Sequence, residues 1–243
     1  TSIIDSYGES VNSLALQQDG KIVVAGYVIL DESDQFLIAR YTANGVPDNQ
    51  FGNNGIITTK IGELNSEASS LAIAPDGKIV TGGYTYDPFS SAERDFIMAR
   101  YNTNGTTDNS FGENGIAFTG IKASRKQGQS MAVQTDGKVV AAGNLPGPGN
   151  SFRDIAVIRY GTNGAPDNSF SQDGISTTTF NGLTTNDTLR ALAIQPDGKI
   201  VVAGSSSDGS PGDFSLARYN PNGSIDLQFI QDFNGKNFVV NSI

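Results

Sequence analysis

The chain has 243 residues, a formal net charge of −9, and no cysteine, histidine or tryptophan. These absences exclude disulfides, thiolate and imidazole metal sites, and catalytic triads that depend on histidine. The acidic balance argues against nucleic acid as a partner, and no stretch approaches the about 20 apolar residues of a membrane span. The chain begins at Thr1 without an initiator methionine, so we expect a mature or excised piece of a protein.

One pattern occurs four times along the chain. An apolar strand is followed by Asp-Gly-Lys, a second apolar strand that reaches a glycine, Arg-Tyr, and then Asp-x-x-Phe. The Asp-Gly-Lys lysines are 57, 60 and 61 residues apart, and the tyrosines are 60, 59 and 59 apart. A period near 60 residues that is filled with strands and turns predicts repeated β-units. The lysines are Lys21, Lys78, Lys138 and Lys199, and the tyrosines are Tyr41, Tyr101, Tyr160 and Tyr219.

Each repeat predicts four antiparallel strands. Alternating or continuous apolar residues mark the strands, and the Asp-Gly turns suit the positive φ of tight hairpins. In the first repeat we expect the second, third and fourth strands at 22–26, 36–41 and 56–59. In the second repeat the corresponding strands are expected at 79–83, 96–101 and 116–119, and in the third at 139–143, 155–160 and 175–179. In the fourth repeat we expect a first strand at 189–194 and the other three at 200–204, 214–219 and 238–241.

The repeated strands predict an all-β fold, a β-propeller of four-stranded antiparallel blades with about 60 residues each. A β-helix has much shorter rungs, and a sandwich does not repeat its loops in register. We expect one domain over 1–243 with four blades, although residues 2–5 and 238–241 both resemble a fourth strand. Five blades or a larger oligomeric ring are therefore alternatives, and an unpaired terminal edge strand could bind a second chain. The expected repeat units are 1–51, 52–111, 112–170 and 171–243.

The fourth repeat carries a long and specific motif. Asp-Gly-Lys-Ile-Val-Val-Ala-Gly at 197–204 is followed by Asp-Phe-x-Leu-Ala-Arg-Tyr-Asn-x-Asn-Gly-Ser-x-Asp-x-x-Phe at 213–229. This sequence resembles the delta-sixty repeat, an uncharacterised bacterial β-propeller family, and the resemblance covers essentially the whole chain. It implies a propeller in a secreted or surface protein, but it implies no activity and transfers no functional residue.

The arginine before each repeated tyrosine is followed eight residues later by an aspartate. We interpret these pairs as structural clamps, one in each blade, rather than as four ligand sites. A nearby phenylalanine is expected to pack between blades. Calcium binding at turns such as 108–115 is the alternative interpretation. These turns lack the EF-hand arrangement of acidic positions, so we expect no cofactor. The pairs are Arg40 with Asp48, Arg100 with Asp108, Arg159 with Asp167 and Arg218 with Asp226, and the phenylalanines are Phe51, Phe111, Phe170 and Phe229.

The loops after the second and fourth strands vary between repeats, whereas the turns after the first and third strands are nearly identical. Variable loops that share one face of a repeat scaffold are expected to carry recognition. We place them at 27–35, 84–95, 144–154 and 205–213 within blades, and at 60–68, 120–128 and 180–188 between them. Their aromatic and arginine residues can stack on sugars or anchor a protein, although Tyr27 and Tyr84 can instead simply end a strand. The candidate binding residues are Tyr27, Tyr84, Tyr86, Phe89, Arg94, Phe152 and Arg153.

These observations favour a non-enzymatic binding or adhesion module, secreted or at the bacterial cell surface, that recognises a glycan or a protein. A structural scaffold within a larger surface protein is the first alternative. A glycan-active enzyme that uses two carboxylates is the second, because such chemistry needs no histidine. Nothing in the sequence singles out two of the acids that do not recur.

Overall fold

The computed structural model describes residues 7–87, 89, 94–123, 130–146, 153–178, 186–207 and 213–229. These residues form β-strands, turns and a short 3₁₀ helix, η2 (Leu227–Phe229). In this part of the chain no helix has the length and apolarity that a membrane crossing requires. The strands expected at 2–5 and 238–241 lie outside the described residues.

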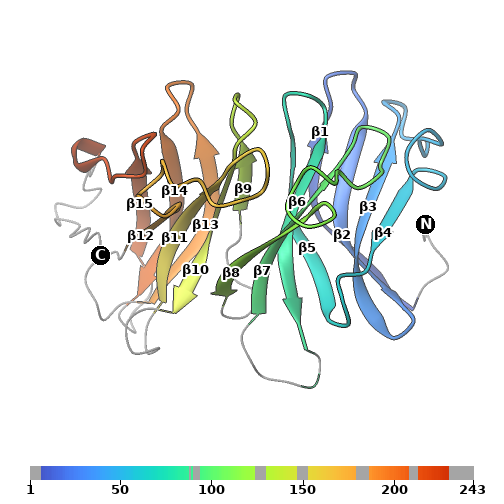
Figure 1. Cartoon of the computed structure of the whole chain (residues 1–243), viewed down its shortest axis with the longest axis horizontal. Coiled ribbons are helices and arrows are strands. Elements are labelled where there is room, and N and C mark those ends of the chain that lie inside the picture. The colour runs from blue at the N-terminus through green and yellow to red at the C-terminus, as the bar shows by residue number, and fades with distance from the viewer. Residues whose placement is uncertain are drawn as a thin grey trace. The chain divides into compact units, whose positions relative to one another are not determined.

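The strands form four consecutive antiparallel sheets, the predicted blades (Figure 1). Blades 3 and 4 are linked by the parallel pairing of Arg153 with Asn186. Blade 1 contains β1 (Glu9–Leu16), β2 (Ile22–Leu30), β3 (Ser33–Tyr41) and β4 (Ile56–Thr59), and blade 2 contains β5 (Asn65–Ile73), β6 (Ile79–Tyr86), β7 (Arg94–Tyr101) and β8 (Ile116–Ala123). Blade 3 contains β9 (Ser130–Val133), β10 (Val139–Pro146), β11 (Arg153–Tyr160) and β12 (Ile175–Thr178), and blade 4 contains β13 (Asn186–Ile194), β14 (Ile200–Ser207) and β15 (Asp213–Tyr219).

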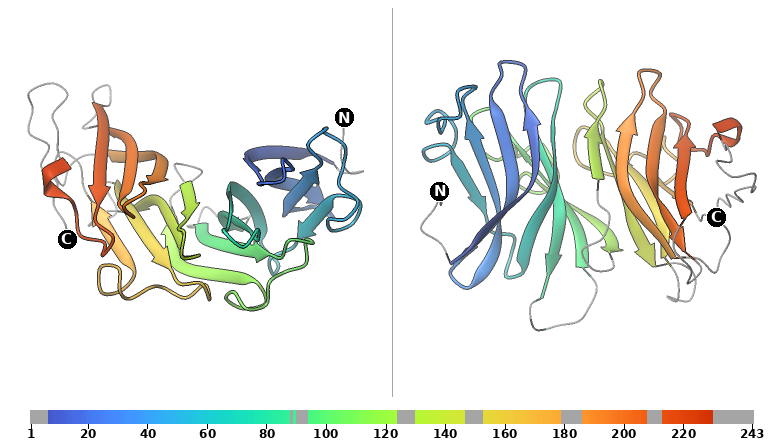
Figure 2. Two further views of the ribbon diagram at one scale, coloured as in Figure 1. Left: turned by 90° about the horizontal axis from the view of Figure 1, so that it is seen from above. Right: turned by 180° about the vertical axis from the view of Figure 1, so that it is seen from behind.

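The blades belong to two compact units. Unit 1 comprises Thr1–Gly120 with Thr135–Gly137, and unit 2 comprises Ile121–Gln134 with Lys138–Ile243. Blade 1 and all of blade 2 except the end of β8 lie in unit 1, and most of blade 3 and all of blade 4 lie in unit 2. Figure 2 shows the two blades of each unit as twisted sheets beside one another. One propeller domain over 1–243 stays a prediction.

Each unit has its own apolar core between its two blades. In unit 1, Phe36 and Ile38 of blade 1 pack in one cluster with Leu71, Ile79 and Ile97 of blade 2. The cluster of unit 2 joins Val140, Ile155 and Val157 of blade 3 to Leu189, Ile200 and Val202 of blade 4. Burying an aliphatic or aromatic side chain of this size contributes roughly 2 kcal/mol, so each joint between blades is a major source of stability.

The two ends of each blade are built differently. At the turn end, the Asp-Gly-Lys turns place Gly20, Gly77 and Gly198 at φ of 81–82°, where glycine has no steric cost. The carboxylates of Asp19, Asp76 and Asp197 accept a hydrogen bond from the backbone N–H of the turn lysine at 3.1 Å. Their expected role as turn residues is confirmed. The opposite end, which carries the connection between the second and third strands, is called the hairpin end (Figure 1).

The glycine of the second strand marks a β-bulge and not the end of the strand. In blades 1, 2 and 4 the register shifts opposite this glycine, for example between Ala68 and Ser70. A Cβ atom on Gly83 would lie 2.1 Å from the Glu67 carbonyl oxygen, and one on Gly26 would lie 1.9 Å from that of Ser10. The repeated glycine is therefore required because backbone approaches it closely.

The strands continue beyond this glycine, so the expected loops 27–35, 84–95, 144–154 and 205–213 are wrong in extent. β2 and β3 are connected by Asp31 and Glu32 alone, with φ of 48° and 61°. Such a two-residue turn matches the twist of an antiparallel hairpin. The variable segments shrink to 31–32, 87–93, 147–152 and 208–212, and Tyr27, Tyr84 and Tyr86 lie on strands.

Candidate functional site

The predicted arginine–aspartate clamps are present in all four blades. Arg40 Nε donates to Asp48 Oδ2 at 2.8 Å, and Arg100 and Arg159 form the same bond with Asp108 and Asp167 at 2.7 Å. Arg218 binds Asp226 at 2.9 Å. Each guanidinium also lies over the repeated phenylalanine, 4.2–4.9 Å from the ring centre. Each clamp is therefore an ion pair with a cation–π contact.

The Asp-Gly-Lys lysine is a third member of each clamp, which the sequence analysis missed. Lys21 Nζ lies 3.2 Å from Asp48, and the distance is 2.9 Å for Lys78 and Asp108. Lys138 and Lys199 approach Asp167 and Asp226 to 3.0 and 2.8 Å. The recurrence of this lysine in every turn is a signal that could have revealed it, because the turn itself requires only Asp-Gly.

Two clamps also join one blade to the next. Arg40 Nη1 donates to the carbonyl oxygen of Thr103 in blade 2 at 2.6 Å, and Arg159 Nη1 donates to that of Pro221 in blade 4 at 2.6 Å. The repeated tyrosines reinforce these joints: the hydroxyls of Tyr101 and Thr59 are 2.7 Å apart, and those of Tyr219 and Thr178 are 2.5 Å apart. The recurring polar residues thus serve the joints between blades.

The clamp aspartates are held in their ionised form. Burial would raise the pKa of Asp108, but hydrogen bonds from Ser110 and Lys78 and the charge of Arg100 outweigh it and hold the pKa well below its usual range. The pKa values of Asp48 and Asp167 are lowered by the same kinds of contact against the same opposing effect of burial. The hydrogen bond from Lys199 is the main cause of the lowered pKa of Asp226.

The calcium alternative finds no structural support in the turns that were proposed for it. Oδ2 of Asp108 is already bound by Arg100 and Lys78, and Oδ1 accepts a hydrogen bond from Ser110 at 2.7 Å. Among the described residues, no three acidic side chains gather as a metal ion would need. These carboxylates neutralise the protein's own cations.

The hairpin end of unit 1 holds a different polar cluster, formed by Asp34, Asn65, Glu67, Tyr84 and Tyr86. The Tyr86 hydroxyl of blade 2 donates to the Asp34 carboxylate of blade 1, and the Tyr84 hydroxyl donates to Glu67 Oε2 at 2.5 Å. The backbone N–H of Asp34 donates to Asn65 Oδ1 at 3.2 Å. The rings of Tyr84 and Tyr86 are tilted by 42° with centres 6.1 Å apart.

The tyrosines of this cluster differ in exposure. Tyr84 is 5% exposed, so the expectation of an exposed ring at this position is wrong. Tyr86 is half-buried. Burial, followed by the hydrogen bond to Asp34 and its negative charge, raises the pKa of Tyr86 well above its usual value. The phenol therefore stays protonated and acts as a hydrogen-bond donor at neutral pH.

Tyr27 and Phe89 form no contact in this cluster, and the other predicted binding residues cannot be placed in it. Tyr27 is half-buried on β2, and Phe89 is 97% exposed in the segment between β6 and β7. Arg94 and Arg153 begin β7 and β11, and their side chains lie outside the described residues, as does Phe152. As ligand contacts, all seven residues stay predictions.

In unit 2 the corresponding position of the second strand is Asn144, which sequence reasoning missed. Its side-chain amide donates to the Asp187 carbonyl oxygen at 2.7 Å and accepts from the Leu189 N–H at 3.0 Å. It therefore braces blade 3 against blade 4 and is buried. The hairpin ends of the two units thus carry different polar groups at equivalent positions.

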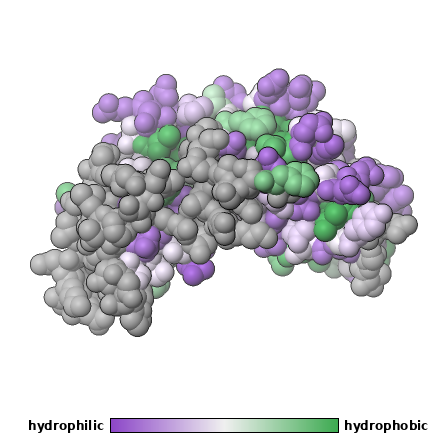
Figure 3. All heavy atoms as spheres, turned by 90° about the horizontal axis from the view of Figure 1, so that it is seen from below, coloured by the Kyte–Doolittle hydropathy of each residue, from purple (hydrophilic) through white to green (hydrophobic). Residues whose placement is uncertain are grey.

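Figure 3 views the molecule from below, relative to Figure 1. The coloured surface there is mainly hydrophilic, and its apolar residues form small separate groups.

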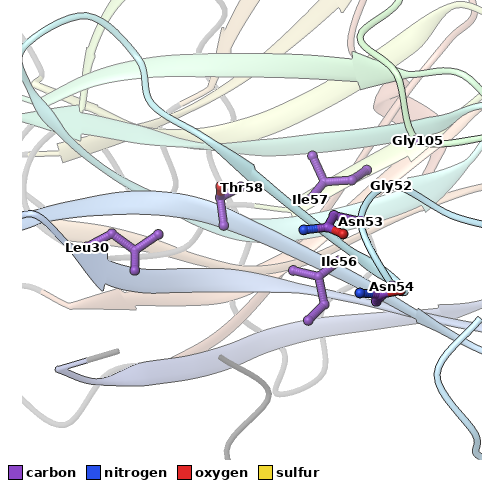
Figure 4. A pocket seen from close by; sticks show the side chains of 8 residues that line it. All are labelled: Leu30, Gly52, Asn53, Asn54, Ile56, Ile57, Thr58 and Gly105. Atoms are coloured by element: carbon purple, nitrogen blue, oxygen red, sulfur yellow. The ribbon is translucent and has the colours of Figure 1, made fainter. Parts of the chain in front are cut away.

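Unit 1 also contains a groove of about 590 Å³ beside the edge strand β4. Figure 4 shows Ile56, Ile57 and Thr58 of this strand together with the turn at Asn53 and Asn54. None of the lining side chains is charged, so the groove supplies no acid, base or strong metal ligand. Its lining residues are Leu30, Gly52, Asn53, Asn54, Ile56, Ile57, Thr58 and Gly105.

Comparison with protein families gives a match over more than half of the chain. A family described as "Domain of unknown function (DUF5122) beta-propeller" matches residues 17–51, 74–111, 134–170 and 195–229. Each matched segment runs from the Asp-Gly-Lys turn to the clamp phenylalanine. No curated protein matches the sequence.

Solved structures resemble the chain only distantly. A protein of unknown function from Dyadobacter fermentans is 12% identical, with a TM-score of 0.49 over 90% of this chain and 68% of that one. A GH43 endo-arabinanase from Bacillus licheniformis is 14% identical, with a TM-score of 0.46 over 87% and 74%. An endo-arabinase from Bacteroides thetaiotaomicron is 8% identical, with a TM-score of 0.44 over 97% and 94%. Likenesses at this level carry no argument about activity.

Proposed function

Since the chain belongs to the DUF5122 family of β-propeller proteins, we propose that it is a non-catalytic binding module whose hairpin ends recognise a glycan. We further propose that it is a bacterial protein of the delta-sixty type that works outside the cell. A protein ligand at the same surface is the alternative. The observation that carries the proposal is that polar side chains form the structural clamps at the turn end and a different cluster at the hairpin end.

At the turn end, the recurring charged side chains are committed to the clamps. At the hairpin end of unit 1, Asp34, Glu67 and Tyr86 do not recur in the other blades, and with Asn65 and Tyr84 they combine carboxylates, an amide and two phenols. Sugar hydroxyls form hydrogen bonds with such groups, and sugar rings stack on exposed aromatic faces. The half-buried Tyr86 and the exposed Phe89 are two aromatics at this end that can do so.

The non-catalytic part of the proposal rests on the hydrogen bonds of the two acids in this cluster. Glycoside hydrolysis requires one carboxylic acid that donates a proton and a second carboxylate that acts as nucleophile or base. Here Asp34 and Glu67 each accept a hydrogen bond from a phenol of the protein itself, from Tyr86 and Tyr84. The cluster is therefore better suited to holding a ligand than to cleaving it.

A glycan-array assay on the purified chain tests the proposal. We expect saturable binding that is lost on Tyr86→Phe combined with Phe89→Ala. Val46→Ala is the matched control, because Val46 is 59% exposed but lies at the turn end. Calcium and chelator arms show whether a metal takes part.

Three results would change the account. Silence on the whole array would overturn the glycan proposal and favour a protein ligand. Equal binding by the double variant would remove the hairpin end as the site. Release of shortened glycans from the array would contradict a non-catalytic role.

A scaffold role is the second candidate. It is favoured by one specific observation, the exposed apolar faces of the first and last blades.

A further inference from the structure

Each complete joint between blades brings together two complementary faces. The leading face of a blade carries the clamp arginine and the residues two and four positions before it, such as Phe36, Ile38 and Arg40. The receiving face of the next blade carries apolar residues of its first strand and the repeated tyrosine, such as Ala68, Leu71 and Tyr101. Both faces are buried where blades 1 and 2 meet in unit 1.

The receiving face of blade 1 is exposed. Strand pairing places Val11 and Leu14 of β1 at the positions that Ala68 and Leu71 occupy in β5. Val11 and Leu14 are 51% and 65% exposed, whereas Ala68 and Leu71 are 0% and 8% exposed. Leu16, further along the same strand, is 67% exposed. Blade 1 therefore exposes an apolar strip, and the equivalent strip of blade 2 is buried in the joint with blade 1.

The repeated tyrosine shows the same difference. Tyr101 and Tyr219 are fully buried and bond the threonine hydroxyl of the preceding blade. Tyr41, at the same position in blade 1, is only half-buried.

The leading face of blade 4 is also exposed. Phe214 is 58% exposed, whereas Phe36 and Ile155 at the same position in blades 1 and 3 are fully buried. The Arg218 side chain is 21% exposed, against 5% for that of Arg40. Its Nη1 donates to Gln195 of its own blade, where Arg40 reaches a carbonyl of the next blade.

We propose that the leading face of blade 4 docks on the receiving face of blade 1 of a second copy of this chain. The two faces are the unused halves of a joint that the chain already forms between blades 1 and 2 and between blades 3 and 4. Both halves are exposed in one chain, so a second copy offers each of them its complement.

The expected contacts follow from the two complete joints. Phe214 packs against Leu14 and Leu16 of the partner, as Phe36 packs in the cluster that contains Leu71. Arg218 reaches the carbonyl oxygen of Ala43, which occupies the position of Thr103 and Pro221 in the repeat. Burial of exposed apolar strips on both sides provides the driving force.

This association is head to tail, because the two docking faces differ. Head-to-tail interfaces form rings where the rotation closes and filaments where it does not. Two chains joined at both ends would form a ring of eight blades, within the four to eight that propellers typically have.

Light scattering on the purified chain tests the proposal over a roughly hundredfold dilution. We expect a mass of at least twice 25.5 kDa at high concentration, which falls toward 25.5 kDa on dilution. Leu14→Asp with Leu16→Asp on the receiving face, or Phe214→Asp on the leading face, weakens association by roughly 30-fold or more. These side chains are exposed in the single chain, so the variants keep their fold. Phe89→Asp is the control, because it removes an even more exposed aromatic, 97% against 58% for Phe214, from outside both faces.

A mixing experiment separates this joint from other kinds of association. The receiving-face variant keeps an intact leading face, and the leading-face variant keeps an intact receiving face. Each alone is expected to be monomeric, and an equal mixture is expected to form a dimer through one joint. A mass of 25.5 kDa at every concentration of the unaltered chain, or a mixture that stays monomeric, overturns the proposal.

Discussion

The turn end and the hairpin end of the blades use their polar residues in opposite ways. At the turn end the same three residues meet in every blade, where the lysine and the arginine both bind the aspartate. At the hairpin end the equivalent positions hold different groups, such as Tyr84 in blade 2 and Asn144 in blade 3. In this repeat protein, the residues that most resemble an active site are therefore the ones that the fold itself requires.

The largest expected effect concerns the clamp between blades 1 and 2. Arg40→Met removes the guanidinium that binds Asp48, the Thr103 carbonyl and the Phe51 ring. We expect a loss of about 3 kcal/mol in the free energy of unfolding, because a buried charge loses its main partner. Urea denaturation measures it. Arg218→Met is the matched control and should cost less, since Arg218 does not bond a following blade. Equal losses would contradict the role of the clamp in joining blades.

The second prediction concerns pH and acts on all four clamps. Because the folded state lowers the pKa of Asp108 and its counterparts, their stabilising effect is fully present above the usual carboxyl value of 3.8. It is lost as the pH falls below that value through the lower folded pKa. The free energy of unfolding should therefore stay level between about pH 7 and pH 5 and decline in more acidic solution. Asp108→Asn should make the decline shallower, and an unchanged slope would contradict this assignment.

The third prediction compares the two tyrosines of the hairpin end. Tyr84→Phe removes the hydroxyl that donates to the buried Glu67 and should cost about 2 kcal/mol of stability. Tyr86→Phe, at the half-buried position, should cost about 1 kcal/mol or less. Thermal unfolding of the two variants measures the difference. A larger loss for Tyr86 would mean that its bond to Asp34 mainly holds blades 1 and 2 together.

The smallest effect on stability is expected for Phe89→Ala. The ring is 97% exposed, so the free energy of unfolding should change by no more than about 0.5 kcal/mol. Denaturation by urea checks this value. A clear destabilisation would show that Phe89 packs against its own loop.

Much of the fold could be predicted from the sequence because each signal was local. Strand positions followed from apolar alternation, and the clamps followed from a constant spacing of eight residues. The length of the hairpins was missed, although Tyr27-Val28-Ile29-Leu30 is rich in strand-forming residues. The glycine before this run suggests the end of a strand. In the structure the strand continues, and the glycine is needed because a bulge on the neighbouring strand brings backbone close to it.

The site was harder to predict because its contacts are long-range. Asp34 and Tyr86 are 52 residues apart and come from different blades. Their contact depends on how the two sheets pack, which no local pattern records. The burial of Tyr84 likewise depends on the register that places it opposite Glu67.

Binding by the hairpin end is the central claim, and a titration of the strongest array glycan tests it most directly. The unaltered chain and Val46→Ala should bind with the same affinity. The Tyr86→Phe and Phe89→Ala double variant should bind at least about tenfold more weakly while it unfolds at nearly the same temperature. A double variant that binds as tightly as the unaltered chain would contradict the claim, as would the absence of any glycan to titrate.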